Sequence, residues 1–163
     1  LVSLETQTAL ADFDVLAFSV SFEWDYVNLL TMLRLAGLPL RAAERNRHHP
    51  LVVLGGAVTF LNPEPLAPFV DVVCVGEGEV IVPDLVREIA RVGDRRELLE
   101  ALSLRPGIYV PSLVDVSYDA AGRVSAIAPA SVGVIFTGSK EINSSTASAG
   151  TPRISSWRLP NFR

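Results

Sequence analysis

The sequence predicts an α/β protein built on an open parallel sheet, and two observations lead to that prediction. Three short apolar runs, rich in valine and with little alternation, occupy residues 14–19, 51–56 and 70–76. Runs of this kind are typical of parallel strands that are covered on both faces. Segments with helical spacing separate the runs, and this strand–helix alternation predicts crossover connections within one open sheet.

The first predicted helix follows the first strand. Residues 26–36 carry apolar side chains at helical spacing, and Asp25 is the expected N-cap. Gly37 and then Pro39 end the pattern, as expected at a helix C-terminus. Residues 1–4 read as a further strand that the start of the sequence truncates.

Two more helices are expected after the third strand. Residues 79–92 place one apolar stripe on a single face, made of Ile81, Leu85, Ile89 and Val92. Residues 94–97, Asp-Arg-Arg-Glu, have the form of a capping box that opens the next helix, and Pro106-Gly107 closes it.

After residue 107 the pattern changes, so we divide the chain into three parts. Residues 1–107 form a partial α/β domain. Residues 108–132 form a β-hairpin extension, because apolar and polar residues alternate around a turn that contains Gly122. Residues 133–163 are rich in Ser and Thr without a visible period, which predicts a largely disordered tail or linker.

Composition and charge exclude several classes of protein. Of the 163 residues, 49% are hydrophobic, which suffices for a packed core, and no apolar run approaches the roughly 18 residues of a membrane span. The net charge is −4. Residues 1–132 have 10 basic and 17 acidic residues (−7), and residues 133–163 have 4 basic residues and 1 acidic residue (+3). The acidic body argues against nucleic acid as a partner.

Cysteine usage and the chain start give two further expectations. Cys74 is the single cysteine, which excludes an internal disulfide and a cysteine-built metal or iron–sulfur site. We therefore expect a cytoplasmic protein, with Cys74 as a small core residue. Because the sequence opens on Leu1 within an apolar stretch, we expect it to be a piece of a longer protein.

The candidate site lies where the predicted strands end, because ligands of open parallel sheets bind at the carboxyl edge. Ser19 and Ser21 follow the first strand, Gly55 and Gly56 end the second, and residues 76–79, Gly-Glu-Gly-Glu, follow the third. Glycine at a strand end allows a close ligand approach. It also serves a plain strand-to-helix turn, and both interpretations stay open.

Other kinds of site are disfavoured. Gly76 and Gly78 do not complete a dinucleotide fingerprint, since Ile81 stands at the third glycine position. Lys140 is the only lysine and lies in the tail, so a phosphate-binding loop with lysine is absent. His48 and His49 precede the second strand, which puts them at the opposite edge, in a solvated loop rather than a metal site. We assign no catalytic residue and no metal ligand.

Three aromatic residues follow the first candidate position. Phe22, Trp24 and Tyr26 stand at alternate positions, beside Glu23 and Asp25. They either pack under the next helix or form a flat apolar wall for a large planar ligand.

Several motifs, taken in order, resemble a known family. They are Asp-Val-Leu-Ala-Phe-Ser (14–19), Pro-Leu-Val-Val-Leu-Gly-Gly (50–56), Asn-Pro-Glu-Pro-Leu (62–66) and Val-Asp-Val-Val-Cys-Val-Gly-Glu-Gly-Glu (70–79). This order resembles the cobalamin-binding-like N-terminal domain of radical S-adenosylmethionine proteins, and it is most similar to uncharacterised fused members of that family.

The resemblance implies a flavodoxin-like sheet whose first, central strand precedes Leu1, with cobalamin on the carboxyl edge. It implies that Trp24 lies under the corrin and that Gly76, Glu77, Gly78 and Glu79 form the junction with a catalytic barrel. The nucleotide tail of the cofactor is then lined by Ser19, Ser21, Gly55 and Gly56.

Two motifs of related proteins are missing from this sequence. The Asp-x-His-x-x-Gly loop of cobalamin-dependent mutases is absent, so no histidine here serves as the lower axial ligand. The Cys-x-x-x-Cys-x-x-Cys cluster motif is absent too, so S-adenosylmethionine and the iron–sulfur cluster belong to a catalytic domain outside this sequence. The expected function is that of a non-catalytic accessory domain. The alternatives are a ligand-free scaffold that packs against the barrel and a flavin or nucleotide binder of flavodoxin type.

Overall fold

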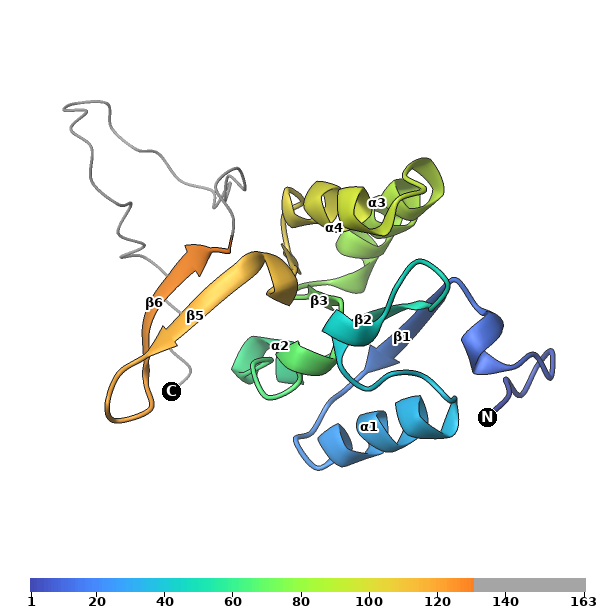
Figure 1. Ribbon diagram of the computed structural model, residues 1–163, viewed down its shortest axis with the longest axis horizontal. Coiled ribbons are helices and arrows are strands. Elements are labelled where there is room, and N and C mark those ends of the chain that lie inside the picture. Colours follow the sequence, from blue (N-terminus) through green and yellow to red (C-terminus); the bar gives the residue numbers. More distant parts are fainter. Residues whose placement is uncertain (131–163) are drawn as a thin grey trace.

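The fold was analysed in a computed structural model, which describes residues 1–130 (Figure 1). The predicted tail therefore lies outside the described residues. Short 3₁₀ turns span Leu10–Asp12, Ala42–Glu44, Ala67–Phe69 and Pro111–Leu113. The helices and strands are β1 (Val15–Ser19), α1 (Asp25–Leu35), β2 (Leu51–Gly55), α2 (Val58–Leu61), β3 (Val72–Cys74), α3 (Gly78–Arg91), α4 (Arg95–Ser103), β4 (Ile108–Tyr109), β5 (Val114–Tyr118) and β6 (Val124–Pro129).

The main sheet confirms the predicted fold class. Its order is β1-β2-β3-β4; β1 pairs with β2 and β2 with β3 in parallel, while β4 runs antiparallel to β3. The register places Val15 opposite Leu51 and Ser19 opposite Gly55. The fold is thus a mostly parallel α/β sheet of flavodoxin-like type with a separate antiparallel hairpin, β5-β6.

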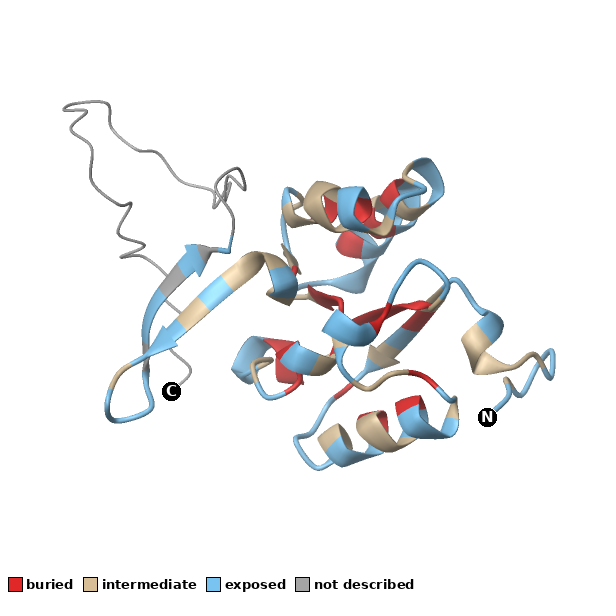
Figure 2. Cartoon of the chain, viewed as in Figure 1, coloured by how far each residue is buried: buried red, intermediate tan, exposed pale blue. Residues whose placement is uncertain are grey.

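Helices cover the sheet from both faces, which explains the continuous apolar strands (Figures 1 and 2). The side chains of Leu16, Val52 and Leu54 pack with Leu29 and Leu33 of α1. On the other face Leu51, Val53 and Val72 pack with Leu85 of α3 and with Leu98 and Leu102 of α4. Alternate residues of each strand therefore enter two separate cores.

The ends of the helices follow the sequence signals in part. Gly37 has a φ of +73°, and Leu38 N donates to Leu33 O, which is the expected glycine stop of α1. The Asp94 carboxylate accepts from the N–H groups of Arg96 and Glu97, so the predicted cap of α4 is present. The expectation for Asp25 was wrong, because it is the first residue of α1 and its Oδ1 accepts from Asn28 Nδ2 instead.

The prediction of a strand at residues 1–4 was also wrong. Val2 forms only an isolated antiparallel bridge with Ala9. Gln7 has a φ of +57°, and Ser3 N donates to Thr8 O, so the segment folds back on itself before a ladder can form. It therefore leaves β1 as the edge of the main sheet.

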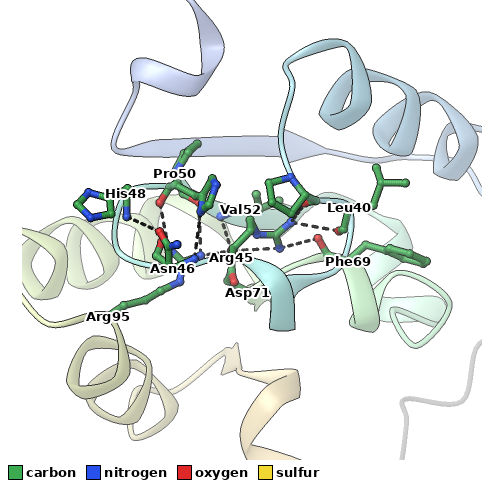
Figure 3. A network of polar contacts seen from close by, with 11 residues as sticks. Leu40, Arg45, Asn46, His48, Pro50, Val52, Phe69, Asp71 and Arg95 are labelled. Atoms are coloured by element: carbon green, nitrogen blue, oxygen red, sulfur yellow. Dashed lines mark hydrogen bonds and ion pairs between the residues drawn. The ribbon is translucent and has the colours of Figure 1, made fainter.

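A buried ionic cluster holds the amino edge of the sheet (Figure 3). Asp71 Oδ2 accepts from Val52 N at 2.8 Å and pairs with Arg95 Nη2 at 2.8 Å and Arg45 Nη2 at 3.3 Å. The side chains of Arg45 and Asp71 are 0% and 3% exposed. Burial lowers the pKa of Arg45, and the Asp71 carboxylate opposes that effect.

A second cluster ties α3 to the segment before β4. Glu88 is buried, and its carboxylate binds Arg91 at 2.6 Å and also binds Arg105. The hydrogen bonds from Arg91 and then Arg105 lower the pKa of Glu88. Within residues 1–130, no helix is long and apolar enough to cross a membrane.

The first prediction concerns the Asp71 cluster. Asp71→Asn leaves Arg45 buried without its counter-charge, so we expect the free energy of unfolding to fall by about 3–5 kcal/mol. Urea denaturation of the full chain measures this. The matched control is Asp84→Asn, which removes the exposed pair with Arg87 and should cost no more than about 1 kcal/mol. Equal losses in the two variants would refute a central role for Asp71.

The second prediction concerns acid. Because the folded pKa of Glu88 lies below its unfolded value of about 4.3, its contribution to stability is complete above that pH and is lost as pH falls through the folded pKa. Glu88→Gln should therefore lower the melting temperature at pH 7, and the difference from the parent chain should shrink on acidification. Thermal melts at stepwise lower pH measure this, and a difference that stays constant with pH would contradict it.

Candidate functional site

The carboxyl edge of the sheet brings the three predicted positions to one side of the molecule. Because β1, β2 and β3 are parallel, the residues after each of them lie along the same edge. Ser19 and Gly55 are register partners there. Ser21 follows in the loop to α1, and Gly76 follows β3. Ser19 and Ser21 are exposed, and their hydroxyls have no hydrogen-bond partner within residues 1–130.

The two glycines after β2 differ in their role. Gly56 has a φ of +93°, and a Cβ there would lie 2.5 Å from Val20 O. Val20 N donates to Gly55 O and Val58 N donates to Val20 O, so two backbone loops cross at this point. Gly56 is therefore explained by packing. A Cβ on Gly55 would meet only Phe18 O, at 4.0 Å, which is an ordinary contact, so packing does not require glycine there.

The loop after β3 shows the same division. Gly76 has a φ of +144°, and a Cβ would lie 3.0 Å from Ile81 Cδ1. Gly78 is the first residue of α3, and its nearest neighbour would be Val82 Cγ2 at 4.0 Å. Glu77 and Gly78 are both exposed. The backbone of Gly76 thus shapes the turn, while Glu77 and Gly78 are accessible to a ligand.

Exposed apolar side chains occur in the two segments that follow the first two positions, and the bond from the Tyr26 hydroxyl to Asn62 O joins these segments. Phe22 is 66% exposed and Trp24 is 89% exposed, so these two do not pack in the core. From α2, Phe60 and Leu61 are 49% and 62% exposed. We call these four residues the apolar rim patch. Such patches mark contact surfaces in soluble proteins.

Tyrosine hydroxyls fix the segment that carries part of this patch. Tyr26 packs against the core, and its hydroxyl donates to Asn62 O at 3.0 Å, which joins α1 to the end of α2. Burial, followed by the nearby Glu23 carboxylate, raises the pKa of Tyr26. The hydroxyl of Tyr109 donates to Glu64 Oε1 at 2.9 Å, and burial and this bond raise its pKa as well.

Sequence reasoning missed α2 and the Tyr109–Glu64 contact. The four residues of α2 are too few to show a helical period. The apolar pair Phe60 and Leu61, four and five positions after Gly56, was the available signal. The pairing of β4 with β3 brings Tyr109 to this edge, and no local pattern encodes it.

The carboxyl edge is acidic. Glu23, Asp25, Glu77 and Glu79, here called the acidic rim, form no ion pair within the described part of the chain. Residues 19–26, 55–62 and 76–80 include no Lys, Arg or His. These segments of the edge therefore lack the cationic groups that favour a pyrophosphate, and the carboxylates of Glu77 and Glu79 stand at the N-terminus of α3.

The histidines lie at the opposite edge, as predicted. His49 Nδ1 accepts from Asn46 N, and His49 O accepts from Arg95, which also pairs with Asp71. His48 lies beside Asn46 at this edge (Figure 3). Within residues 1–130, no group of three His, Cys, Asp or Glu side chains is placed to hold a metal ion. Cys74 is half-buried in β3, and burial raises the pKa of its thiol.

An open hollow of about 260 Å³ lies along β1. The residues that line it are all apolar and comprise Leu10, Phe13, Val15, Leu16, Ala17, Phe18 and Met32. It contains none of the predicted site residues. The rim is thus an exposed face and not the wall of this hollow.

Fold and rim together define an α/β domain of flavodoxin-like type with an apolar, acidic carboxyl edge. The family model described as radical SAM proteins, N-terminal, matches residues 1–111. The chain belongs to this family of N-terminal domains of radical S-adenosylmethionine proteins. Searches of curated proteins and of solved structures gave no match.

The third prediction separates the two glycines of the doublet. Gly56→Ala places a Cβ against the Val20 backbone at a left-handed φ, so we expect a loss of at least about 1–2 kcal/mol in the free energy of unfolding. Gly55→Ala should change stability by less than about 0.5 kcal/mol. Urea denaturation of both variants measures this, and a larger cost at Gly55 would show that the packing assignment is wrong.

Proposed function

We propose that this chain is a non-catalytic accessory domain whose carboxyl edge binds the planar face of cobalamin. The observation that supports this most is Trp24, an indole that is 89% exposed in the segment after β1, the strand that pairs with the one ending at Gly55. Planar ligands bind on flat aromatic and glycine surfaces, because no side chain holds the ring away from the wall. Membership of the radical SAM N-terminal family is consistent with such a role.

The residues at the edge fit one side of the cofactor. A Cβ on Gly55 or Gly78 would make a single ordinary contact at 4.0 Å, and the exposed hydroxyls of Ser19 and Ser21, which have no partner within residues 1–130, suit the polar groups of a nucleotide tail. Among residues 1–130, His48 and His49 are the only histidines and both lie at the other edge. A lower axial ligand from this domain is therefore not part of the proposal.

The reaction itself is assigned to another domain. This sequence has one cysteine and cannot hold an iron–sulfur cluster by itself. We place S-adenosylmethionine and the cluster in a catalytic barrel of the same parent protein, with residues 76–79 at the junction. The accessory domain then orients cobalamin toward that barrel.

A ligand-free scaffold is the second candidate, and one observation favours it. The apolar rim patch is a protruding face without an enclosing wall, which also suits a flat contact with a catalytic domain. A flavin or nucleotide binder is less well supported, because Glu77 and Glu79 stand where a phosphate would lie.

The fourth prediction tests cobalamin binding. The full chain is mixed with hydroxocobalamin and desalted, and the visible spectrum of the protein peak is read. We expect a retained corrin spectrum. Trp24→Ala should weaken binding by roughly tenfold through loss of the stacking surface, and Gly55→Val should abolish retention by placing a branched side chain at the edge.

His48→Ala is the matched control, because His48 is exposed at the opposite edge. It should retain the same spectrum as the parent chain. Loss of colour from every sample would favour the scaffold. Loss in His48→Ala alone would move the site to the histidines.

A further inference from the structure

The carboxyl edge has two properties that together specify an occupant. It presents the apolar rim patch, Phe22, Trp24, Phe60 and Leu61, and none of these side chains is buried. It also presents the acidic rim, whose four carboxylates lack ion-pair partners within residues 1–130. A partner that covers this edge therefore combines large apolar side chains with positive charge.

The last ten residues of the chain have this composition. Residues 154–163 read Ile-Ser-Ser-Trp-Arg-Leu-Pro-Asn-Phe-Arg, and Arg153 precedes them. They supply four large apolar residues, Ile154, Trp157, Leu159 and Phe162, and no acidic residue. Beyond residue 130 the chain has 4 basic residues and 1 acidic residue, whereas residues 1–130 have 10 and 17.

The covalent connection is long enough for this segment to reach the edge. The described structure ends one residue after β6, at residue 130. The 24 residues from there to Ile154 span up to roughly 80 Å when extended. A tethered segment has an effective concentration on the order of millimolar, so weak contacts suffice to hold it.

We propose that residues 153–163 dock on the carboxyl edge of their own chain. Trp157 and its apolar neighbours cover the apolar rim patch, and Arg153, Arg158 and Arg163 pair with the acidic rim. The docked segment shields Trp24 from solvent. One consequence rests on the proposed function: the segment and a cofactor at this edge compete for the same surface.

The fifth prediction tests docking without any cofactor, in the full chain. Trp157→Phe leaves Trp24 as the sole tryptophan, since the sequence has two. In this background we expect Trp24 to be protected from acrylamide quenching. Arg153→Glu, Arg158→Glu and Arg163→Glu together should raise quenching and shift the emission to longer wavelength, and high salt should act in the same direction because it screens exposed charges.

Two further variants make the test specific. The control reverses three exposed arginines elsewhere, Arg34→Glu, Arg47→Glu and Arg87→Glu, and should leave Trp24 protected. Glu23→Lys, Glu77→Lys and Glu79→Lys should expose Trp24 by themselves and restore protection when combined with the tail reversal. Circular dichroism checks that each variant keeps its helices.

Three outcomes overturn the proposal. The first is that acrylamide quenches Trp24 as freely in the Trp157→Phe background as in the tail reversal. The second is that combining the three Glu→Lys changes with the tail reversal restores no protection. The third is that protection declines on dilution, which would place the tail on a second copy. Hydroxocobalamin retention is read separately. If docking holds, the tail reversal should increase retention; absence of cobalamin binding with intact docking would refute only the proposed function.

Discussion

The fold depends most on one buried carboxylate. Asp71 accepts an N–H of the neighbouring strand and binds two guanidinium groups, so it joins β2, β3, the loop that holds Arg45, and α4. The second arginine leaves the cluster with an excess positive charge. Six backbone carbonyls compensate for it, those of Pro39, Leu40, Phe69, Asn46, His49 and Pro50. A buried ion cluster is tolerable only when most of its donors are satisfied in this way, and here the buried Nε of Arg45 lacks a partner within residues 1–130.

This arrangement gives the two edges of the sheet opposite properties. At the amino edge, arginine side chains bind backbone carbonyls and so join the loops to one another. The carbonyl of His49 is one of these acceptors. At the carboxyl edge, the backbone contacts near Gly56 fix the turns, while the acidic rim forms no ion pair within residues 1–130 and Phe22 and Trp24 are exposed. The buried ion cluster therefore ties the loops together at one edge, and the exposed groups of the other edge are available for contact with a partner.

The strands and long helices could be predicted from local pattern. A strand that is covered on both faces is a continuous apolar run, and a helix that packs on the sheet carries an apolar stripe with a period of about 3.6 residues. The stripe of Ile81 and Leu85 is buried as expected. The sequence could not show that Asp71 is shared by two distant arginines, since the contact with Arg45 spans 26 positions and that with Arg95 spans 24. Nor could it decide between the two interpretations of the glycine doublet. That decision depends on Val20, a residue brought there by the parallel pairing.

The exposure of the rim aromatics is the feature that local rules explain least. A large apolar side chain gains about 1.5–3 kcal/mol when it is fully buried, so a face with Phe22, Trp24 and two residues of α2 forgoes several such contributions. Tyr26 shows that the same segment can direct an aromatic ring into the core, where its hydroxyl also finds Asn62 O. The core therefore does accept an aromatic ring from this segment, although Trp24 remains outside it. It follows that the patch is most simply understood as surface that another group covers, and the acidic residues around it restrict that group to one that is neutral or basic.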